Sequence, residues 1–309
     1  PNYAQAYFNR GVVKVELNDH KGAISDYNKA LEINPNHQVA FNARGILKAV
    51  LKDYSGAILD YNEAIKINSD YTDAYGNRAY AKVQLNDHKG AIIDYTHAID
   101  IDPCRKDLFN CRGIAKSNLK DYSGAIIDYN KAIDIDPNYA DPYYNRGVNK
   151  VELNEIKSAI LDYNKAIDID PNHKGALNNR GNAKASLEDN SGAIIDYTKA
   201  IEIYPKDEIA YFNRGVSKRS LGDNYGAIID YTTAIEINPD HFHAYINRGV
   251  VKAILNDYSG AIIDYTKAIE INPNHADSFA NRGITRRNSE DYSGAIIDYN
   301  TAIELNPNY

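Results

Sequence analysis

The sequence predicts an all-α protein built from repeated helix pairs, and three observations lead to this prediction. Proline recurs every 34 residues, or once after twice 34, from Pro35 to Pro307, and Ser69 fills the one vacant position. An Asp-Tyr pair recurs with the same spacing from Tyr27 to Tyr299, which makes nine copies. No segment alternates between apolar and polar residues with period two, so we expect no sheet.

Each copy, or repeat, is predicted to contain two helices. In the first repeat a helix is expected from Ala4 to Leu17, because its aromatic, glycine and aliphatic residues lie three or four apart. The sequence Leu-Asn-Asp then ends this helix, and Asp19 caps the second one. Pro137 cannot continue the second helix of the fourth repeat, and we expect Asn138 to cap the helix that follows.

The repeats follow one another without long linkers, so we expect a single continuous array over residues 1–309. Because the chain opens and closes with Pro-Asn-Tyr, at the same point of the repeat, we also expect it to be part of a longer array. The predicted repeats are 2–35, 36–69, 70–103, 104–137, 138–171, 172–205, 206–239, 240–273 and 274–307.

This pattern resembles the tetratricopeptide repeat. The seventh repeat places Tyr211, Gly215, Ala227, Tyr231 and Pro239 at the positions that define that family. The resemblance covers the whole chain. It implies an α-solenoid, a right-handed superhelix of stacked antiparallel helix pairs, in which the first helix of each pair lines a concave groove.

Two positions depart from the family pattern in all nine repeats. The residue before the glycine is arginine instead of leucine, as in Arg112, and the second aromatic residue is a cation such as Lys116. A buried cation needs a partner. The second helix offers an aspartate before its tyrosine in every repeat, Asp128 in the fourth. We therefore predict a row of bidentate Arg–Asp pairs that serve the fold, with the lysine sharing the carboxylate. The alternative is a row of arginines that binds an anion.

An asparagine precedes the arginine in seven repeats and lies about 100° around the helix from it, which should turn it toward the groove. Its amide offers a donor and an acceptor, so a column of such residues suits the backbone of an extended peptide. The column is similar to the asparagine ladder of O-linked N-acetylglucosamine transferases and peroxisomal import receptors, which implies a peptide in the groove. The alternative is that asparagine only suits a solvated helix face. The predicted peptide-binding residues are Asn9, Asn77, Asn145, Asn179, Asn213, Asn247 and Asn281, with Ala43 and Cys111 in the other two repeats.

The surroundings of the column indicate the chemistry of its ligand. The next turn of the first helix carries aliphatic residues such as Val148 and Val216. Four aspartates are expected at the rim: Asp73, Asp107, Asp141 and Asp277. Such a groove suits an extended segment that is neutral to basic. The lysines with which chaperone-binding members of the family hold an acidic C-terminus are replaced here, so we do not expect that activity.

Several classes of function are not expected. The net charge of −7 argues against a nucleic-acid partner, and no apolar run approaches the ~20 residues that span a membrane. His241 and His243 are interpreted as residues of a surface turn, so we expect no metal site and no cofactor. Cys104 and Cys111 are expected to be free thiols. No nucleophile, base or phosphate-binding loop stands apart from the repeats, so we expect no enzyme.

The sequence thus favours a scaffold that binds an extended segment of a partner protein. One alternative is a targeting or regulatory domain of a larger enzyme whose catalytic part lies outside these residues. Another is a structural spacer that associates head to tail, because the last helix keeps its full apolar set. The identity of the partner and the cell compartment are left open.

Overall fold

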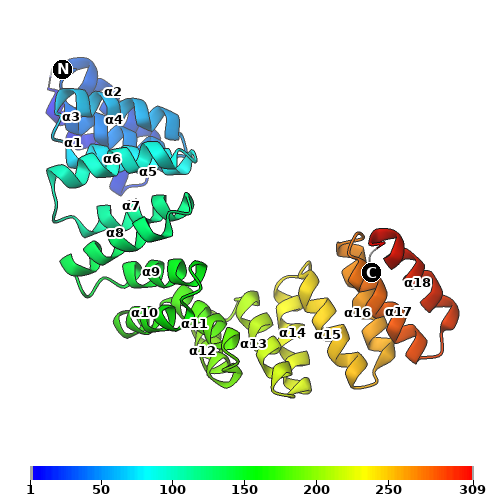
Figure 1. Cartoon of the computed structure of the whole chain (residues 1–309). Helices are drawn as coiled ribbons and strands as arrows, with labels where there is room; N and C mark the ends of the chain where they lie inside the picture. Colours follow the sequence, from blue (N-terminus) through cyan, green and yellow to red (C-terminus); the bar gives the residue numbers. More distant parts are fainter. Residues whose placement is uncertain (1–2, 308–309) are drawn as a thin grey trace. The chain divides into compact units, whose positions relative to one another are not determined.

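The computed structural model describes residues 3–307, which form eighteen α-helices and no strand. The predicted all-α fold, an α-solenoid of stacked helix pairs, is confirmed, and Figure 1 labels the helices in chain order. The helices are α1 (Ala4–Glu16), α2 (His20–Ile33), α3 (Gln38–Val50), α4 (Tyr54–Ile67), α5 (Thr72–Gln84), α6 (His88–Ile101), α7 (Lys106–Asn118), α8 (Tyr122–Ile135), α9 (Ala140–Glu152), α10 (Ile156–Ile169), α11 (Lys174–Ser186), α12 (Asn190–Ile203), α13 (Glu208–Ser220), α14 (Asn224–Ile237), α15 (Phe242–Ile254), α16 (Tyr258–Ile271), α17 (Ala276–Asn288) and α18 (Tyr292–Leu305).

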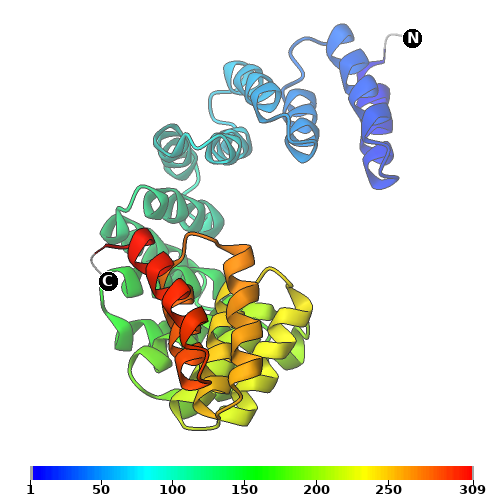
Figure 2. The same cartoon turned by 90° about the vertical axis from the view of Figure 1, so that its right-hand side faces the viewer.

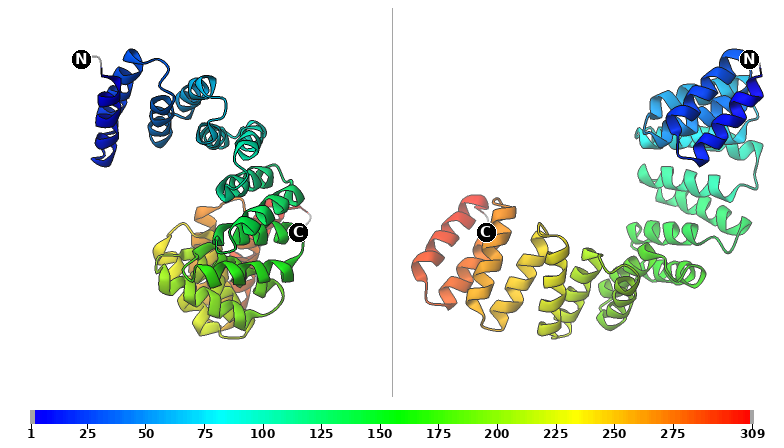
Figure 3. Two further views of the ribbon diagram at one scale, coloured as in Figure 1. Left: turned by 90° about the vertical axis from the view of Figure 1, so that its left-hand side faces the viewer. Right: turned by 180° about the vertical axis from the view of Figure 1, so that it is seen from behind.

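The chain forms two compact units, residues 1–155 and 156–309. The first unit contains α1 to α9 and the second contains α10 to α18. Within each unit every helix packs against the next one along the chain, as the views in Figures 2 and 3 also show. Odd-numbered helices are the first helices of the repeats and even-numbered helices are the second. The boundaries of the single nine-repeat array stay a prediction.

The turn inside each repeat combines a helix end with a helix start. After α1 the backbone N–H of Asp19 donates to Lys14 O at 2.8 Å, and Asn18 takes the left-handed conformation with φ of 59°. These are features of a Schellman motif, which satisfies the last carbonyls of a helix. The Asp19 carboxylate then accepts from Gly22 N at 2.9 Å. The prediction that Asp19 caps the second helix is confirmed.

The turn between repeats differs from the prediction for Asn138. The cap residue of α9 is Tyr139, with no hydrogen bond from its side chain, so the assignment of Asn138 as the cap was wrong. The physical reason is that Asp136 already accepts from Asn138 N at 2.9 Å, which makes a turn of its own and moves the helix start one residue on. In other repeats a histidine fills this position, as when His241 Nδ1 accepts from Ala244 N at 3.3 Å.

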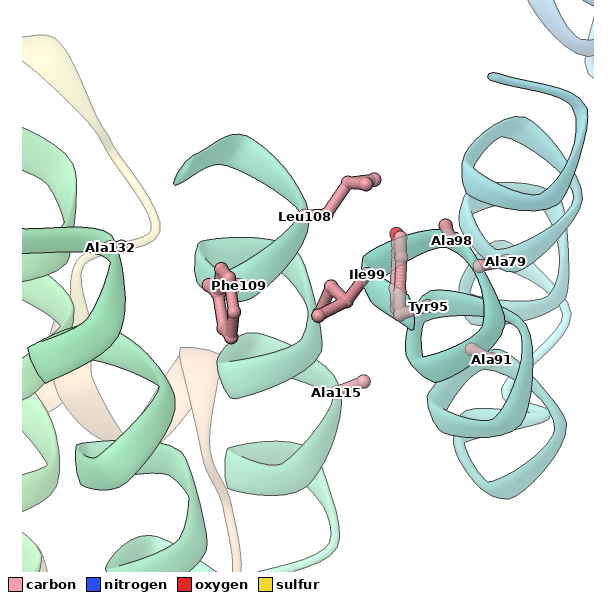
Figure 4. Packing of buried hydrophobic residues seen from close by; sticks show 9 residues of the cluster. All are labelled: Ala79, Ala91, Tyr95, Ala98, Ile99, Leu108, Phe109, Ala115 and Ala132. Carbon is pink, nitrogen blue, oxygen red and sulfur yellow. The ribbon is translucent and has the colours of Figure 1, made fainter. Parts of the chain in front are cut away.

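The core between the helices consists of small residues around one tyrosine per repeat. In the fourth repeat Ala125, Tyr129 and Ala132 are fully buried. A Cβ at Gly113 would lie 2.6 Å from Tyr129 Cε1, so the glycine permits the ring to lie against the backbone of α7. Figure 4 shows the neighbouring cluster, in which Tyr95 and Ile99 of α6 face α7. The close approach of paired helices sets which of their residues are left for the surface.

Candidate functional site

A buried aspartate lies between the two helices of each repeat whose helices belong to one unit. In the fourth repeat Asp128 is 1% exposed, and Arg112 donates to both of its oxygens, from Nε at 3.0 Å and from Nη2 at 2.7 Å. Lys116 Nζ lies 2.8 Å from Asp128 Oδ2. The predicted bidentate pair and its shared lysine are therefore present, and two cations compensate one buried carboxylate.

The same arginine also joins consecutive repeats, which the sequence analysis did not predict. Arg112 Nη1 donates to Thr96 Oγ1 on α6 at 3.0 Å, and its guanidinium lies 5.5 Å from the centre of the Phe109 ring. One guanidinium thus contacts α6, α7 and α8. The signal was in the sequence, because the residue after the Asp-Tyr pair is Asn or Thr in every repeat. The contacts across repeats are Arg44–Asn28, Arg78–Asn62, Arg112–Thr96, Arg146–Asn130, Arg180–Asn164, Arg214–Thr198, Arg248–Thr232 and Arg282–Thr266.

The ion pairs recur in the eight repeats whose two helices belong to one unit. In the fifth repeat, Arg146 lies in the first unit and Asp162 in the second. In the first repeat, the hydrogen bond from Arg10 to Asp26 is the main cause that holds the pKa of this carboxyl at about 2, below its usual 3.8. The pairs are Arg10–Asp26, Arg44–Asp60, Arg78–Asp94, Arg112–Asp128, Arg180–Asp196, Arg214–Asp230, Arg248–Asp264 and Arg282–Asp298. These arginines serve the fold, as predicted.

The asparagines of the predicted binding column occupy the same position on their first helices. Asn9 is exposed, and the other six are partly buried. Asn9, Asn77 and Asn145 belong to the first unit, whereas Asn179, Asn213, Asn247 and Asn281 occupy four consecutive repeats of the second. The run from Asn145 to Asn281 is thus interrupted by the boundary between the units, and the longest run in one unit begins at Asn179.

Several amides of the column already contact neighbouring side chains. Asn77 Nδ2 donates to Asn42 Oδ1 at 3.1 Å, and Asn213 Nδ2 donates to Asn182 Oδ1 at 3.0 Å. An amide has two N–H donors and an oxygen with two lone pairs, so one such contact leaves capacity for a ligand. Asn247 is more constrained, because Arg219 Nη1 donates to its oxygen at 3.0 Å.

The residues around the column only partly match the predicted acidic rim and aliphatic floor. Val216 is partly buried, and the equivalent Ile284 is 43% exposed. The net negative charge of the rim is smaller than the number of its aspartates suggests. Arg105 donates to Asp73 Oδ1 at 2.9 Å and to both oxygens of Asp107, so these two carboxylates share one cation. Sequence spacing did not reveal this pairing because Arg105 occurs in one repeat only.

A second regular surface lies on the second helices and was missed in the sequence analysis. The residue before each buried aspartate is aliphatic in all repeats but the first, and these side chains are between 59% and 68% exposed. Ile263 lines an open pocket of about 500 Å³ together with Tyr245 and Lys267. Exposed apolar residues at regular spacing form a candidate interaction surface. We call this set the isoleucine row: Leu59, Ile93, Ile127, Leu161, Ile195, Ile229, Ile263 and Ile297.

The remaining candidate chemistry of the sequence has a structural explanation. His241 is the cap residue of α15, and its ring lies 4.9 Å from that of Phe212, where burial lowers the pKa of the imidazole. In the part of the chain that the structure describes, no three His, Cys, Asp or Glu residues are grouped as a metal site requires. Cys104 and Cys111 are free. None of the described helices combines the length and apolarity needed to cross a membrane.

Comparisons with known proteins agree with this architecture. Models of the tetratricopeptide repeat family match most of the chain, at residues 4–37, 72–103, 117–148, 140–173, 175–207, 209–241, 243–275 and 264–297. No curated protein sequence matches. Among solved structures, YrrB is 25% identical with a TM-score of 0.53, over 59% of this chain and 93% of that one. A tetratricopeptide repeat protein from Parabacteroides merdae is 16% identical with a TM-score of 0.61, over 80% and 98%. The Cut9–Hcn1 complex matches at 14% identity and a TM-score of 0.56, over 99% of this chain and 74% of that one.

Stacked helix pairs joined by side chains that cross from repeat to repeat define a helical-repeat scaffold. The family matches identify its kind: the chain belongs to the tetratricopeptide repeat family. Membership in this family supports a role as a scaffold for protein interaction. In place of the family's leucine and second aromatic residue, this chain has the arginine and the lysine of its ion clusters.

Replacing Asp128 by alanine tests the ion cluster. The change leaves Arg112 and Lys116 partly buried without their carboxylate, so we expect the free energy of unfolding to fall by about 3–5 kcal/mol. Asp134→Ala is the matched control, because Asp134 is exposed on the same helix. Urea denaturation measures both variants, and equal stability of Asp128→Ala and the parent would contradict the role of the cluster.

Proposed function

We propose that the chain binds an extended segment of a partner protein along the asparagine column. The observation that carries this proposal is the recurrence of one partly buried amide in four consecutive repeats of the second unit, from Asn179 to Asn281. An extended peptide repeats its own donors and acceptors at regular intervals. A row of amides on successive helices therefore matches its backbone, whatever its side chains are.

The surroundings of the amides support this proposal. The partly buried aliphatic residues next to the column, such as Val216 and Val250, offer apolar surface to the side chains of the ligand. YrrB, which shares 25% identity, is described as a tetratricopeptide repeat protein with an unusual peptide-binding site. In this chain the Asn213 amide, with one N–H used, retains more hydrogen-bonding capacity than that of Asn247.

Peptide arrays test this function. We expect the parent chain to bind a subset of random capped 15-residue peptides. The variant with Asn179, Asn213, Asn247 and Asn281 changed to alanine should bind them at least about 30-fold more weakly, since four lost hydrogen bonds of at least ~0.5 kcal/mol each amount to about 2 kcal/mol. Methylation of the peptide's backbone nitrogens should weaken binding to the parent more than rearrangement of its side chains does.

The matched control changes Ile195, Ile229 and Ile263 of the isoleucine row to glutamate. These residues are exposed on the second helices, so the changes should preserve the fold and the affinity for peptide. Unchanged affinity in the asparagine variant would remove the column from the mechanism. Loss of affinity in the isoleucine variant alone would place the binding surface on that row.

Head-to-tail association of two copies is a second candidate function, because the two end helices have complementary faces. Val13 on α1 is 58% exposed, whereas the equivalent Leu47 is 3% exposed, since α3 packs on α2. At the other end Ile296 of α18 is 59% exposed, whereas the equivalent Ile262 is partly covered. Between consecutive repeats, the arginine hydrogen-bonds the Asn or Thr that follows the Asp-Tyr pair. At the two ends these positions are Arg10, which is 60% exposed, and Asn300, which is also exposed.

Sedimentation velocity of the 309-residue chain over a hundredfold range of concentration tests this association. We expect the mean mass to rise with concentration, and Ile296→Glu to abolish the rise because it places a charge in the apolar end face. Ile229→Glu is the control, since Ile229 is exposed away from the ends. A parent chain that stays monomeric throughout the range would exclude the association.

A further inference from the structure

The asparagine column is interrupted in the fourth repeat, and a recess lies at that place. Its volume is about 200 Å³, and its walls include Gly76 and Tyr80 of α5, Tyr95 of α6, and Leu108 and Cys111 of α7. Cys111 occupies the position of the missing asparagine. Figure 4 shows the side chain of Leu108 leaving α7 on the side of α6, where the ring of Tyr95 lies. All these elements belong to the first unit.

The recess exists because the third repeat has a glycine where the other repeats have larger side chains. The residues equivalent to Gly76 include Phe8, Phe212 and Ile246. A Cβ built at Gly76 would already lie 3.0 Å from Leu108 Cδ2. Any longer side chain at this position would therefore extend into the space. The recess therefore marks a departure from the repeat at the junction between α5 and α7.

The size and chemistry of the recess select the group that it can hold. A cavity of ~150 Å³ with apolar walls admits a benzene ring, so about 200 Å³ accommodates one medium or large side chain. The walls are two tyrosines, a leucine and a thiol. Tyr95 and Leu108 are at most 4% exposed, so these two residues form a buried, largely apolar inner wall.

The polar groups at the mouth are already paired with one another. Arg105 bonds both Asp73 and Asp107, and Asn77 Nδ2 donates to Asn42. The inner wall of Tyr95 and Leu108 offers no charged group, so a charged side chain that passes the mouth would lose its hydration without a charged partner there. The recess therefore favours a neutral, apolar side chain.

We propose that this recess is a specificity pocket that takes one apolar side chain, the size of leucine, isoleucine or phenylalanine, from a segment bound along Asn77 and Asn145, the column residues of the first unit on either side of it. The source of this side chain rests on the proposed peptide binding, whereas the preference of the recess for an apolar group does not. The amides on either side contact the backbone of the segment, and the recess fixes its register by accepting one side chain. Fixing one position is what makes binding to a backbone selective.

The two cysteines allow a direct test on the whole chain. Cys111 lines the recess, where burial raises the pKa of its thiol, and Cys104 is exposed and serves as the internal reference. The probes are three methanethiosulfonates that carry a propyl, a trimethylammonium-ethyl or a sulfonatoethyl group. The rate at Cys111 divided by the rate at Cys104, measured by mass spectrometry of peptides, should be at least about tenfold higher for the propyl reagent.

Gly76→Ile should lower the propyl rate at Cys111 about tenfold and leave the rate at Cys104 unchanged, because it fills the recess. The eighth repeat carries Ile246 at this position, and Gly76→Ala gives a milder step toward the same filling. Thermal unfolding of each variant verifies the fold. Equal relative rates for charged and apolar reagents, or a rate at Cys111 that Gly76→Ile leaves unchanged, would overturn the proposal.

A second arm separates this inference from the proposed function. Array peptides whose binding is weakened by Asn77→Ala with Asn145→Ala should contain an apolar residue at one fixed position and should slow the propyl reaction at Cys111 but not at Cys104. If the reagents discriminate but no peptide binds, the proposed function fails and the recess stands as a site for a small apolar group. If peptides that depend on Asn77 and Asn145 bind without an apolar preference and without protecting Cys111, the specificity pocket is refuted while peptide binding stands.

Discussion

Each repeat carries an aspartate before the tyrosine of its second helix, and the arrangement of the helices depends on how this charge is compensated. Removing a carboxylate from water costs several kcal/mol unless close partners replace the hydration. Asp128 obtains two hydrogen bonds from one arginine and a contact from a lysine one turn further on. The arginine also donates to the second helix of the preceding repeat. The interaction that compensates the charge therefore also sets the position of one repeat on the next.

This constraint explains the surface that the first helices present. With the arginine and lysine directed at the second helix, the residue before the arginine is turned about 100° away. In seven repeats this residue is asparagine, and its amide is placed at equivalent points of successive repeats. The candidate binding surface is thus a consequence of the packing in each unit. The proposed specificity pocket lies where the repeat is broken, at Gly76 and Cys111.

Much of this arrangement could be predicted from the sequence, because the same residue pattern recurs in nine repeats and chance matches do not recur with one period. The helix pairs, the cap at Asp19 and the pairing of Arg112 with Asp128 were predicted from spacing and from the need to compensate a buried charge. The cap at Asn138 was wrong because the Asp136 side chain competes for the same backbone. The contact from Arg112 to Thr96 was missed because spacing within one repeat does not report which residues meet across two.

Features that occur once could not be derived from periodicity. Arg105 pairs with both Asp73 and Asp107 and so reduces the acidity that the rim aspartates indicated. The recess requires a glycine on α5, a thiol on α7 and a leucine beside it, and these come together only when the helices are placed in space. The binding role of the asparagine column stays a prediction, since the geometry fixes where the amides lie but not what they bind.

The contact between consecutive repeats is tested most directly by a double-mutant cycle of Arg112→Lys with Thr96→Val. Lysine keeps a cation beside Asp128 but cannot bond the aspartate and the threonine together. The account predicts a coupling free energy of about 1 kcal/mol in urea denaturation, and additive effects when Arg112→Lys is combined with Thr232→Val in the other unit. A coupling free energy between Arg112 and Thr96 within ~0.3 kcal/mol of zero would contradict the claim that this arginine holds the repeats together.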